Sequence, residues 1–159
     1  MITALRNKAV DVVPTIEPAA TQMIDMGVAH RLASAQDVVP WLQDTFFVTS
    51  AAFERSHPKA VVGFLKAYLR AAQEIVANGP QWKPEYVDVL VRWSGIPAKV
   101  FTQIPGLPYY GQFGKIDLDS LARQEALWLS LGLVSEKVDP ASLVDSSAID
   151  EARTERGIQ

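Results

Sequence analysis

The clearest hydrophobic pattern in the chain lies in residues 58–78, where apolar side chains recur every three or four positions. The members of this stripe are Val61, Phe64, Leu65, Tyr68, Ala72, Ile75 and Val76. Such spacing predicts an amphipathic helix with one apolar face. Pro58 suits the first turn of that helix, and Gly79-Pro80 is typical of its end.

Weaker helical patterns, each bounded by a capping residue or a glycine, occur along the rest of the chain. They predict short helices over residues 16–26, 51–55, 84–94, 98–103, 118–131 and 146–153, with single turns at 3–7 and 140–144. Ser50 is the expected N-cap of one helix, and either Asp117 or Asp119 caps another. Residues 34–44 and 105–116 contain proline or glycine without periodicity, so we predict loops there.

Three short runs have the composition of strands instead. Ala9–Val13 is rich in valine, Ala29–Ala33 follows a glycine stop, and Thr45–Thr49 combines β-branched and aromatic residues. Strand, helix and strand in succession over residues 9–33 predict a βαβ unit with a right-handed crossover. The expected fold class is therefore α/β, with few strands and many helices.

The turn between the first predicted strand and its helix is the most suggestive position for a ligand. Thr15 is expected to cap the helix through its hydroxyl group, and Glu17 falls in the first turn, where a carboxylate suits the helix dipole. A helix N-terminus at the carboxyl end of a strand offers free N–H groups to an anion. A purely structural role for both residues is the alternative, and on geometry alone it is the favoured one.

Composition narrows the functional classes. The 159 residues are 48% hydrophobic and 21% charged, with a net charge of -3, which argues against nucleic-acid binding. Cysteine is absent, so disulfides, thiolate metal sites and a cysteine nucleophile are excluded. His30 and His57 lack metal-ligand spacing and no phosphate loop occurs, so no catalytic residue, metal or cofactor is expected. The chain shows neither a membrane-spanning run nor a signal peptide.

Several short motifs follow one another in a recognisable order. They are Ala9-Val10-Asp11, Glu17-Pro18, Gly27, Leu32, Thr45-Phe46-Phe47-Val48-Thr49, His57-Pro58-Lys59-Ala60-Val61-Val62-Gly63-Phe64-Leu65-Lys66-Ala67, Gly132-Leu133-Val134, Asp139 and Leu143-Val144-Asp145. In order and spacing, across residues 3–153, they resemble the second half of periplasmic solute-binding proteins of the nitrate/sulfonate/taurine type, a group that includes binders of thiamine precursors.

This resemblance implies a partial type II periplasmic-binding-protein fold, in which two α/β lobes hold a ligand between them. Residues 1–44 would belong to the second lobe and the approach to its hinge, and residues 45–159 would form the C-terminal part of the first lobe. Family members are roughly twice as long, so we expect the N-terminal half of the fold to be missing from this chain. A second copy or a partner chain would then cover the apolar surface that this half leaves open.

The resemblance also implies a function. The chain would be part of the solute-binding component of an ABC-type importer, located in the periplasm, which delivers a small polar solute to a membrane permease. The implied solutes are a sulfonate, nitrate or a related anion, or a thiamine-precursor pyrimidine.

Five residues are candidates for solute contact. Thr15, Ile16 and Glu17 lie at the expected cleft edge, where Glu17 would repel an anion and would better suit an amine or a pyrimidine ring. Trp41 lies in the segment between the lobes and is expected either to stack on the ligand or to pack within a loop. Tyr109, next to Tyr110 in the predicted loop, is a candidate by position, and a ring that pins the loop to the surface is the favoured alternative.

Two other functions stay open at this point. One is an enzyme of the same fold, since some relatives are pyrimidine synthases of thiamine biosynthesis that use a histidine and a cysteine-rich segment. The absence of cysteine argues against that chemistry. The other is a helical interaction protein that uses the apolar face of residues 58–78.

Overall fold

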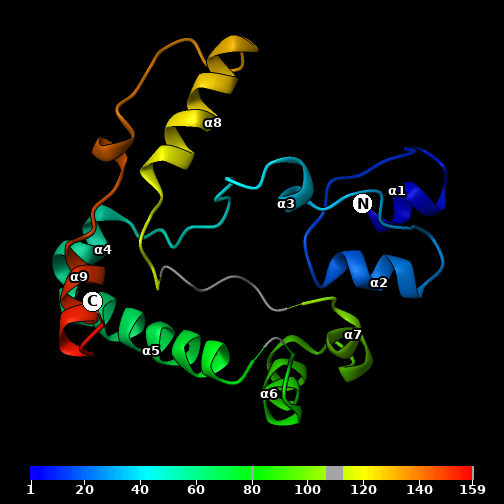
Figure 1. Cartoon of the computed structure of the whole chain (residues 1–159), viewed down its shortest axis with the longest axis horizontal. Helices are drawn as coiled ribbons and strands as arrows, with labels where there is room; N and C mark the ends of the chain where they lie inside the picture. The colour runs from blue at the N-terminus through cyan, green and yellow to red at the C-terminus, as the bar shows by residue number, and fades with distance from the viewer. Residues whose placement is uncertain (80, 107–112, 159) are drawn as a thin grey trace. The chain divides into compact units, whose positions relative to one another are not determined.

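In the computed structural model, which describes residues 1–79, 81–106 and 113–158, every regular element of the described chain is a helix (Figure 1). These residues form two compact units, each built from two stretches of sequence. The first unit contains residues 1–34, 78–79 and 81–106, and the second contains residues 35–77 and 113–158. Each unit has its own small set of buried apolar side chains.

The described part of the first unit is a group of short helices. They are α1 (Ile2–Arg6), α2 (Ala19–Asp25), α6 (Pro84–Ser94) and α7 (Ala98–Gln103). Helix α7 contacts both α2 and α6, and its Phe101 is buried together with Met23 of α2. Helix α6 ends at Gly95, whose φ of 70° lies in the left-handed region that glycine adopts without steric cost. Helix α7 thus packs against both α2 and α6 in this unit.

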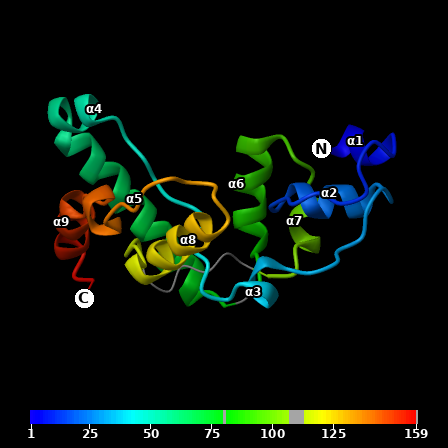
Figure 2. The same ribbon diagram turned by 90° about the horizontal axis from the view of Figure 1, so that it is seen from above.

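The second unit is organised around the long helix α5 (Pro58–Ala77). The other helices of its described part are α3 (Ala35–Val38), α4 (Ala51–Ser56), α8 (Leu118–Ser130), the 3-10 turn η1 (Pro140–Leu143) and α9 (Ser147–Glu155). Helix α9 packs against α5, as both ribbon views show (Figures 1 and 2). Val62 and Leu69 of α5 meet Ala152 of α9 to form the buried apolar cluster of this unit.

Local sequence signals place most of these helices where the sequence predicts them. The Ser50 hydroxyl accepts a hydrogen bond from the N–H of Phe53 and begins α4. Of the two aspartates proposed as the cap of α8, it is Asp117 whose carboxylate accepts from the N–H of Ser120. The boundaries of α5, α6 and α7 also confirm the prediction within a residue. Helix α3 is the exception, since it lies in a predicted loop.

The predicted α/β class, a partial type II periplasmic-binding-protein fold, is wrong for this structure. The described residues contain no strand, and the runs at residues 9–13, 29–33 and 45–49 are irregular. Composition makes a segment suitable for a strand, but a strand exists only when a neighbour satisfies its N–H and C=O groups. Within the described part of the chain, no backbone hydrogen bond joins any two of these runs.

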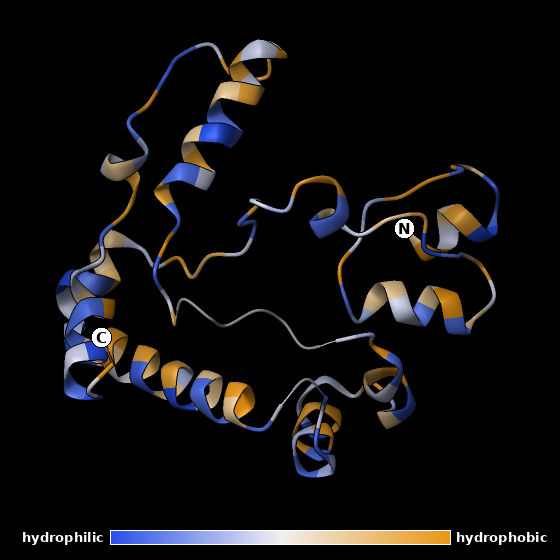
Figure 3. Ribbon diagram, viewed as in Figure 1, coloured by the Kyte–Doolittle hydropathy of each residue, from blue (hydrophilic) through white to orange (hydrophobic). Residues whose placement is uncertain are grey.

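Many large apolar side chains remain exposed. Val48 is 91% exposed and Trp93 is 81% exposed. Helices α5 and α8 carry further examples in Phe64, Leu127 and Trp128. The hydropathy colouring shows orange apolar residues along α5 and α8 next to blue polar ones (Figure 3). Within the described residues, no helix combines the length and the apolar character that crossing a membrane requires.

Candidate functional site

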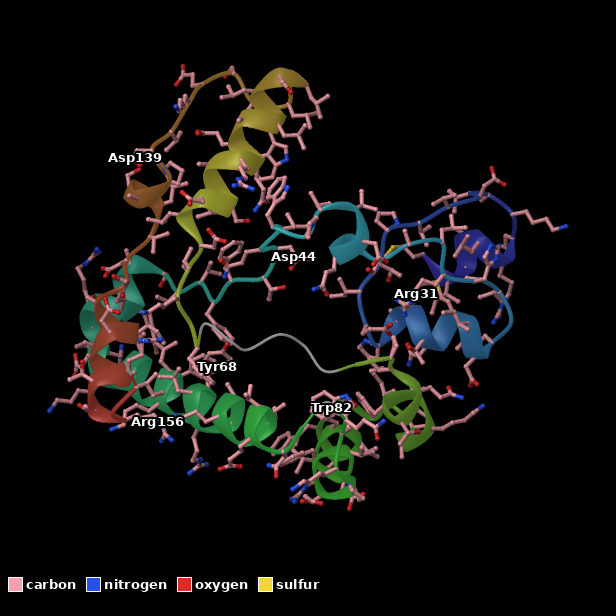
Figure 4. All side chains as sticks on the ribbon, viewed as in Figure 1. Arg31, Asp44, Tyr68, Trp82, Asp139 and Arg156 are labelled. Atoms are coloured by element: carbon pink, nitrogen blue, oxygen red, sulfur yellow. The ribbon has the colours of Figure 1, made fainter. Side chains whose placement is uncertain are left out.

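The carboxylate of Glu17, one of the predicted site residues, accepts a hydrogen bond through each of its two oxygens. One oxygen, Oε2, accepts a hydrogen bond from the backbone N–H of Thr21 at 3.0 Å, and the other, Oε1, accepts from Nη2 of Arg31 at 2.5 Å. The guanidinium of Arg31 reaches this carboxylate from the segment that follows α2 (Figure 4). Glu17 therefore links the first turn of α2 to Arg31, in the segment that follows the helix.

These contacts set the charge of Glu17. Partial burial by itself would raise the pKa of its carboxyl, but the hydrogen bonds from Arg31 and Thr21 outweigh it, so the pKa lies below its ordinary value. Glu17 is thus ionised at neutral pH and is balanced by Arg31. The sequence-based objection that Glu17 would repel an anion is weakened, because the pair as a whole carries no net charge.

Thr15 and Ile16 directly precede Glu17 in the sequence, and Thr15 does not have its predicted role as the helix cap. The predicted cap at Thr15 is wrong, because α2 begins after Pro18 and no side chain of its N-cap residue bonds to it. The Thr15 hydroxyl oxygen is instead shielded from water and has no hydrogen-bond partner in the part of the chain that the structure describes. Ile16 is 74% exposed. A shielded hydroxyl group without a partner is unusual, because burying it unpaired is unfavourable.

A shallow hollow of about 420 Å³ adjoins α2 on the same unit. Its lining consists of Thr21, Ile24, Asp25, Arg31, Gln103 and Pro105. Asp25, at the end of α2, receives a hydrogen bond from Lys99 through its Oδ1 atom. The hollow therefore has one acidic and one basic side chain in its wall, and each of them is held by a partner of opposite charge.

The other two predicted site residues do not belong to the described part of the first unit. Trp41 belongs to the second unit, where the guanidinium of Arg123 lies over its ring at 5.8 Å from the centroid. The neighbouring Gln43 donates its backbone N–H to Ser120 and accepts from the N–H of Asp117 through its side chain. Trp41 is thus part of a segment that packs on α8, which fits the packing alternative. Tyr109 and Tyr110 lie outside the described residues.

Ser56 and His57 form a pair that resembles a catalytic dyad, with 2.8 Å between Oγ and Nδ1. The Ser56 hydroxyl already donates its hydrogen to the carbonyl oxygen of Ala52 at 2.8 Å, so its oxygen accepts a hydrogen bond from Nδ1–H of His57 rather than donating one. An activated serine would need the opposite arrangement. Among the described residues, no group of three histidine, aspartate or glutamate side chains is placed to hold a metal ion.

A second hollow, of about 530 Å³, lies between α8 and the segment that leads into η1. Its charged wall residues are Glu125, Lys137 and Asp139, the last of which is labelled in Figure 4. Glu125 accepts from the backbone N–H of Val138, and Asp139 accepts from the N–H of Ala141 as the cap of η1. Glu125 thus holds the loop to α8 and Asp139 caps η1, which accounts for the position of both carboxylates without a ligand.

Comparison with known proteins leaves the resemblance as a prediction, since no family model, no curated protein and no solved structure matches the chain. Sequence reasoning missed Thr21, Asp25 and Arg31, which frame the hollow beside Glu17. A partial signal was present, because Thr21 and Asp25 are four residues apart in a predicted helix and share one face. The return of Arg31 to Glu17 depends on the path of the loop after Gly27, which local spacing does not encode.

Proposed function

We propose that this chain is part of the solute-binding component of an ABC-type importer, and that the residues around Glu17 contact a small polar solute. The observation that carries the proposal is the Thr15 hydroxyl oxygen, which is shielded and has no hydrogen-bond partner among the described residues. Thr15 lies two residues before Glu17 of the Glu17–Arg31 ion pair. In this proposal a polar solute displaces the atoms that cover the Thr15 hydroxyl oxygen and supplies its missing hydrogen bond, which removes the cost of leaving it unpaired. The order of motifs across residues 3–153 supports the same function.

The balanced Glu17–Arg31 pair fits the range of solutes that the resemblance implies. An oxyanion such as nitrate or a sulfonate would be held by Arg31 and the Thr15 hydroxyl group. An aminopyrimidine would donate its amino group to Glu17. In this proposal the chain works in the periplasm with a membrane permease and without catalysis, and further polypeptide covers its exposed apolar side chains.

Calorimetry and thermal-shift measurements with nitrate, bicarbonate, a sulfonate and an aminopyrimidine test this function. We expect at least one solute to bind saturably to the whole chain. Thr15→Val keeps the shape of the side chain but removes the hydroxyl group, so binding should weaken about tenfold while the free protein becomes no less stable. Thr3→Val, a matched change at an exposed position of α1, should leave binding unchanged. If none of the four solutes gives a binding signal in either measurement, the proposal is wrong.

Helix α5 favours a second candidate function, association with another copy of the chain. One side of α5 is covered by α9, but Ala60, Phe64, Ala67 and Ala71 form another exposed row at helical spacing. The apolar arc is thus wider than the single stripe of an ordinary surface helix. In an antiparallel pair centred near Ala67, Lys59 of one copy would lie beside Glu74 of the other. Light scattering over a range of concentrations distinguishes this function from solute binding.

A further inference from the structure

We propose that the hollow beside α2 takes an extended zwitterion, an ω-amino acid whose carboxylate faces Arg31 and whose ammonium group faces Asp25. This inference rests on the proposed solute-binding function and names the class of solute. It concerns the wall formed by Thr21, Asp25 and Arg31 rather than the Thr15 hydroxyl group.

The two charged wall residues keep free bonding capacity toward the hollow. Within the described part of the chain, Arg31 uses its Nη2 atom for Glu17, which leaves its other guanidinium N–H groups for a carboxylate. Asp25 uses Oδ1 for Lys99, which leaves Oδ2 to accept from an ammonium group. Side-chain exposures of 38% for Arg31 and 31% for Asp25 keep both groups accessible to a solute.

The separation of these charges follows from the helix. Arg31 and the Thr21 N–H both bond to the Glu17 carboxylate, so the guanidinium lies near the level of Thr21. Asp25 lies four residues further along α2, and at the rise of a helix this is roughly 6 Å. Five covalent bonds of an extended chain also cover roughly 6 Å. A solute such as 5-aminopentanoate, which has five bonds between its nitrogen and its carboxyl carbon, matches this spacing, whereas glycine is too short.

The uncharged wall residues suit the middle of such a solute. Ile24 and Pro105 offer apolar surface to a methylene chain, and Gln103 offers an amide at the edge of the hollow. A solute with one charge would leave the opposite wall charge without a new partner. The hollow should therefore distinguish solutes by how many charged groups they carry and by the distance between those groups.

Calorimetric titration of the whole chain tests this with 5-aminopentanoate, glycine, pentanoate and pentylamine. We expect 5-aminopentanoate to bind at least tenfold tighter than each of the other three. Asp25→Asn should remove the preference over pentanoate, because the ammonium group loses its partner. Asp11→Asn, an exposed carboxylate of the same unit, is the matched control and should keep the preference. Circular dichroism of both variants establishes that each retains its helices.

Two outcomes overturn the inference. One is equal or absent binding of the four compounds, and the other is an Asp25→Asn variant that is folded and keeps the full preference. If nitrate, a sulfonate or an aminopyrimidine binds with a Thr15 dependence while 5-aminopentanoate does not, the inference fails and the proposed function stands. If no compound of either series binds, both fail together.

Discussion

The Glu17 carboxylate accepts the backbone N–H of Thr21 at 3.0 Å and also receives the Arg31 guanidinium. A residue before the helix therefore satisfies one of the N–H groups that a helix start leaves free, and it is Glu17 rather than Thr15 that does so. Because a carboxylate is favoured at a helix N-terminus, this bond couples the ionisation of Glu17 to the stability of α2.

The first prediction is a loss of stability in acid that depends on Glu17. The pKa of Glu17 is lowered in the folded chain, so its contribution is present above the ordinary value of 4.5 and is lost as the pH falls below that value through the folded pKa. The urea midpoint of Glu17→Gln should therefore fall less than that of the natural chain between about pH 5 and about pH 3. Glu136→Gln, a change at an exposed carboxylate, should behave like the natural chain. If the urea midpoint falls equally with pH in all three proteins, the prediction is wrong.

The second prediction concerns Ser120, which is 1% exposed at the start of α8. Its hydroxyl oxygen accepts the backbone N–H of Gln43 at 2.9 Å and lies 3.3 Å from Nε2 of Gln124. Ser120→Ala leaves the partly buried N–H of Gln43 without its partner, which should lower the free energy of unfolding by about 1–3 kcal/mol. Ser130→Ala, at an exposed position of the same helix, should cost under about 0.5 kcal/mol. Chemical denaturation of both variants checks this, and equal effects would show that the contact is unimportant.

The helices were largely predictable because their limits are set by neighbours in sequence. Pro58 begins α5, the Ser50 side chain begins α4, and Gly95 ends α6 through its left-handed backbone. The strand predicted at residues 45–49 is absent, because a strand depends on a partner segment rather than on its own composition alone. Phe47 shows what happens instead, since its ring packs edge-on against Phe64 and Tyr68 of α5.

The candidate site was predictable only in part, and for the same reason. Thr15 and Glu17 stand out next to a helix start, but which of them bonds to the helix depends on where the first turn begins. Arg31 and Gln103 reach the site through contacts between residues distant in sequence. Hydropathy and spacing describe faces of single elements, so they do not report which elements meet.

The third prediction compares two leucines of the second unit. Leu69 is fully buried between α5 and α9, whereas Leu133 is 69% exposed after the end of α8. Leu69→Ala removes buried methyl groups and leaves a cavity, so it should cost about 2–5 kcal/mol. Leu133→Ala should stay within about 0.5 kcal/mol of the natural chain. Denaturation midpoints of the two variants measure these losses of stability. A loss well below about 2 kcal/mol for Leu69→Ala would mean that α9 does not cover this side of α5.

The last prediction addresses association through α5. Ala71 lies in the exposed row that also contains Ala60, Phe64 and Ala67, and a carboxylate placed there would have to lose water for two copies to pair. Ala71→Glu should therefore reduce the mass seen by light scattering to that of one chain, at concentrations where the natural chain associates. Ala51→Glu, the same change at the exposed start of α4, should leave association unchanged, because a carboxylate suits a helix start. A natural chain that keeps the mass of a single copy at every concentration would exclude this use of α5, and the exposed row would then be left for a different polypeptide.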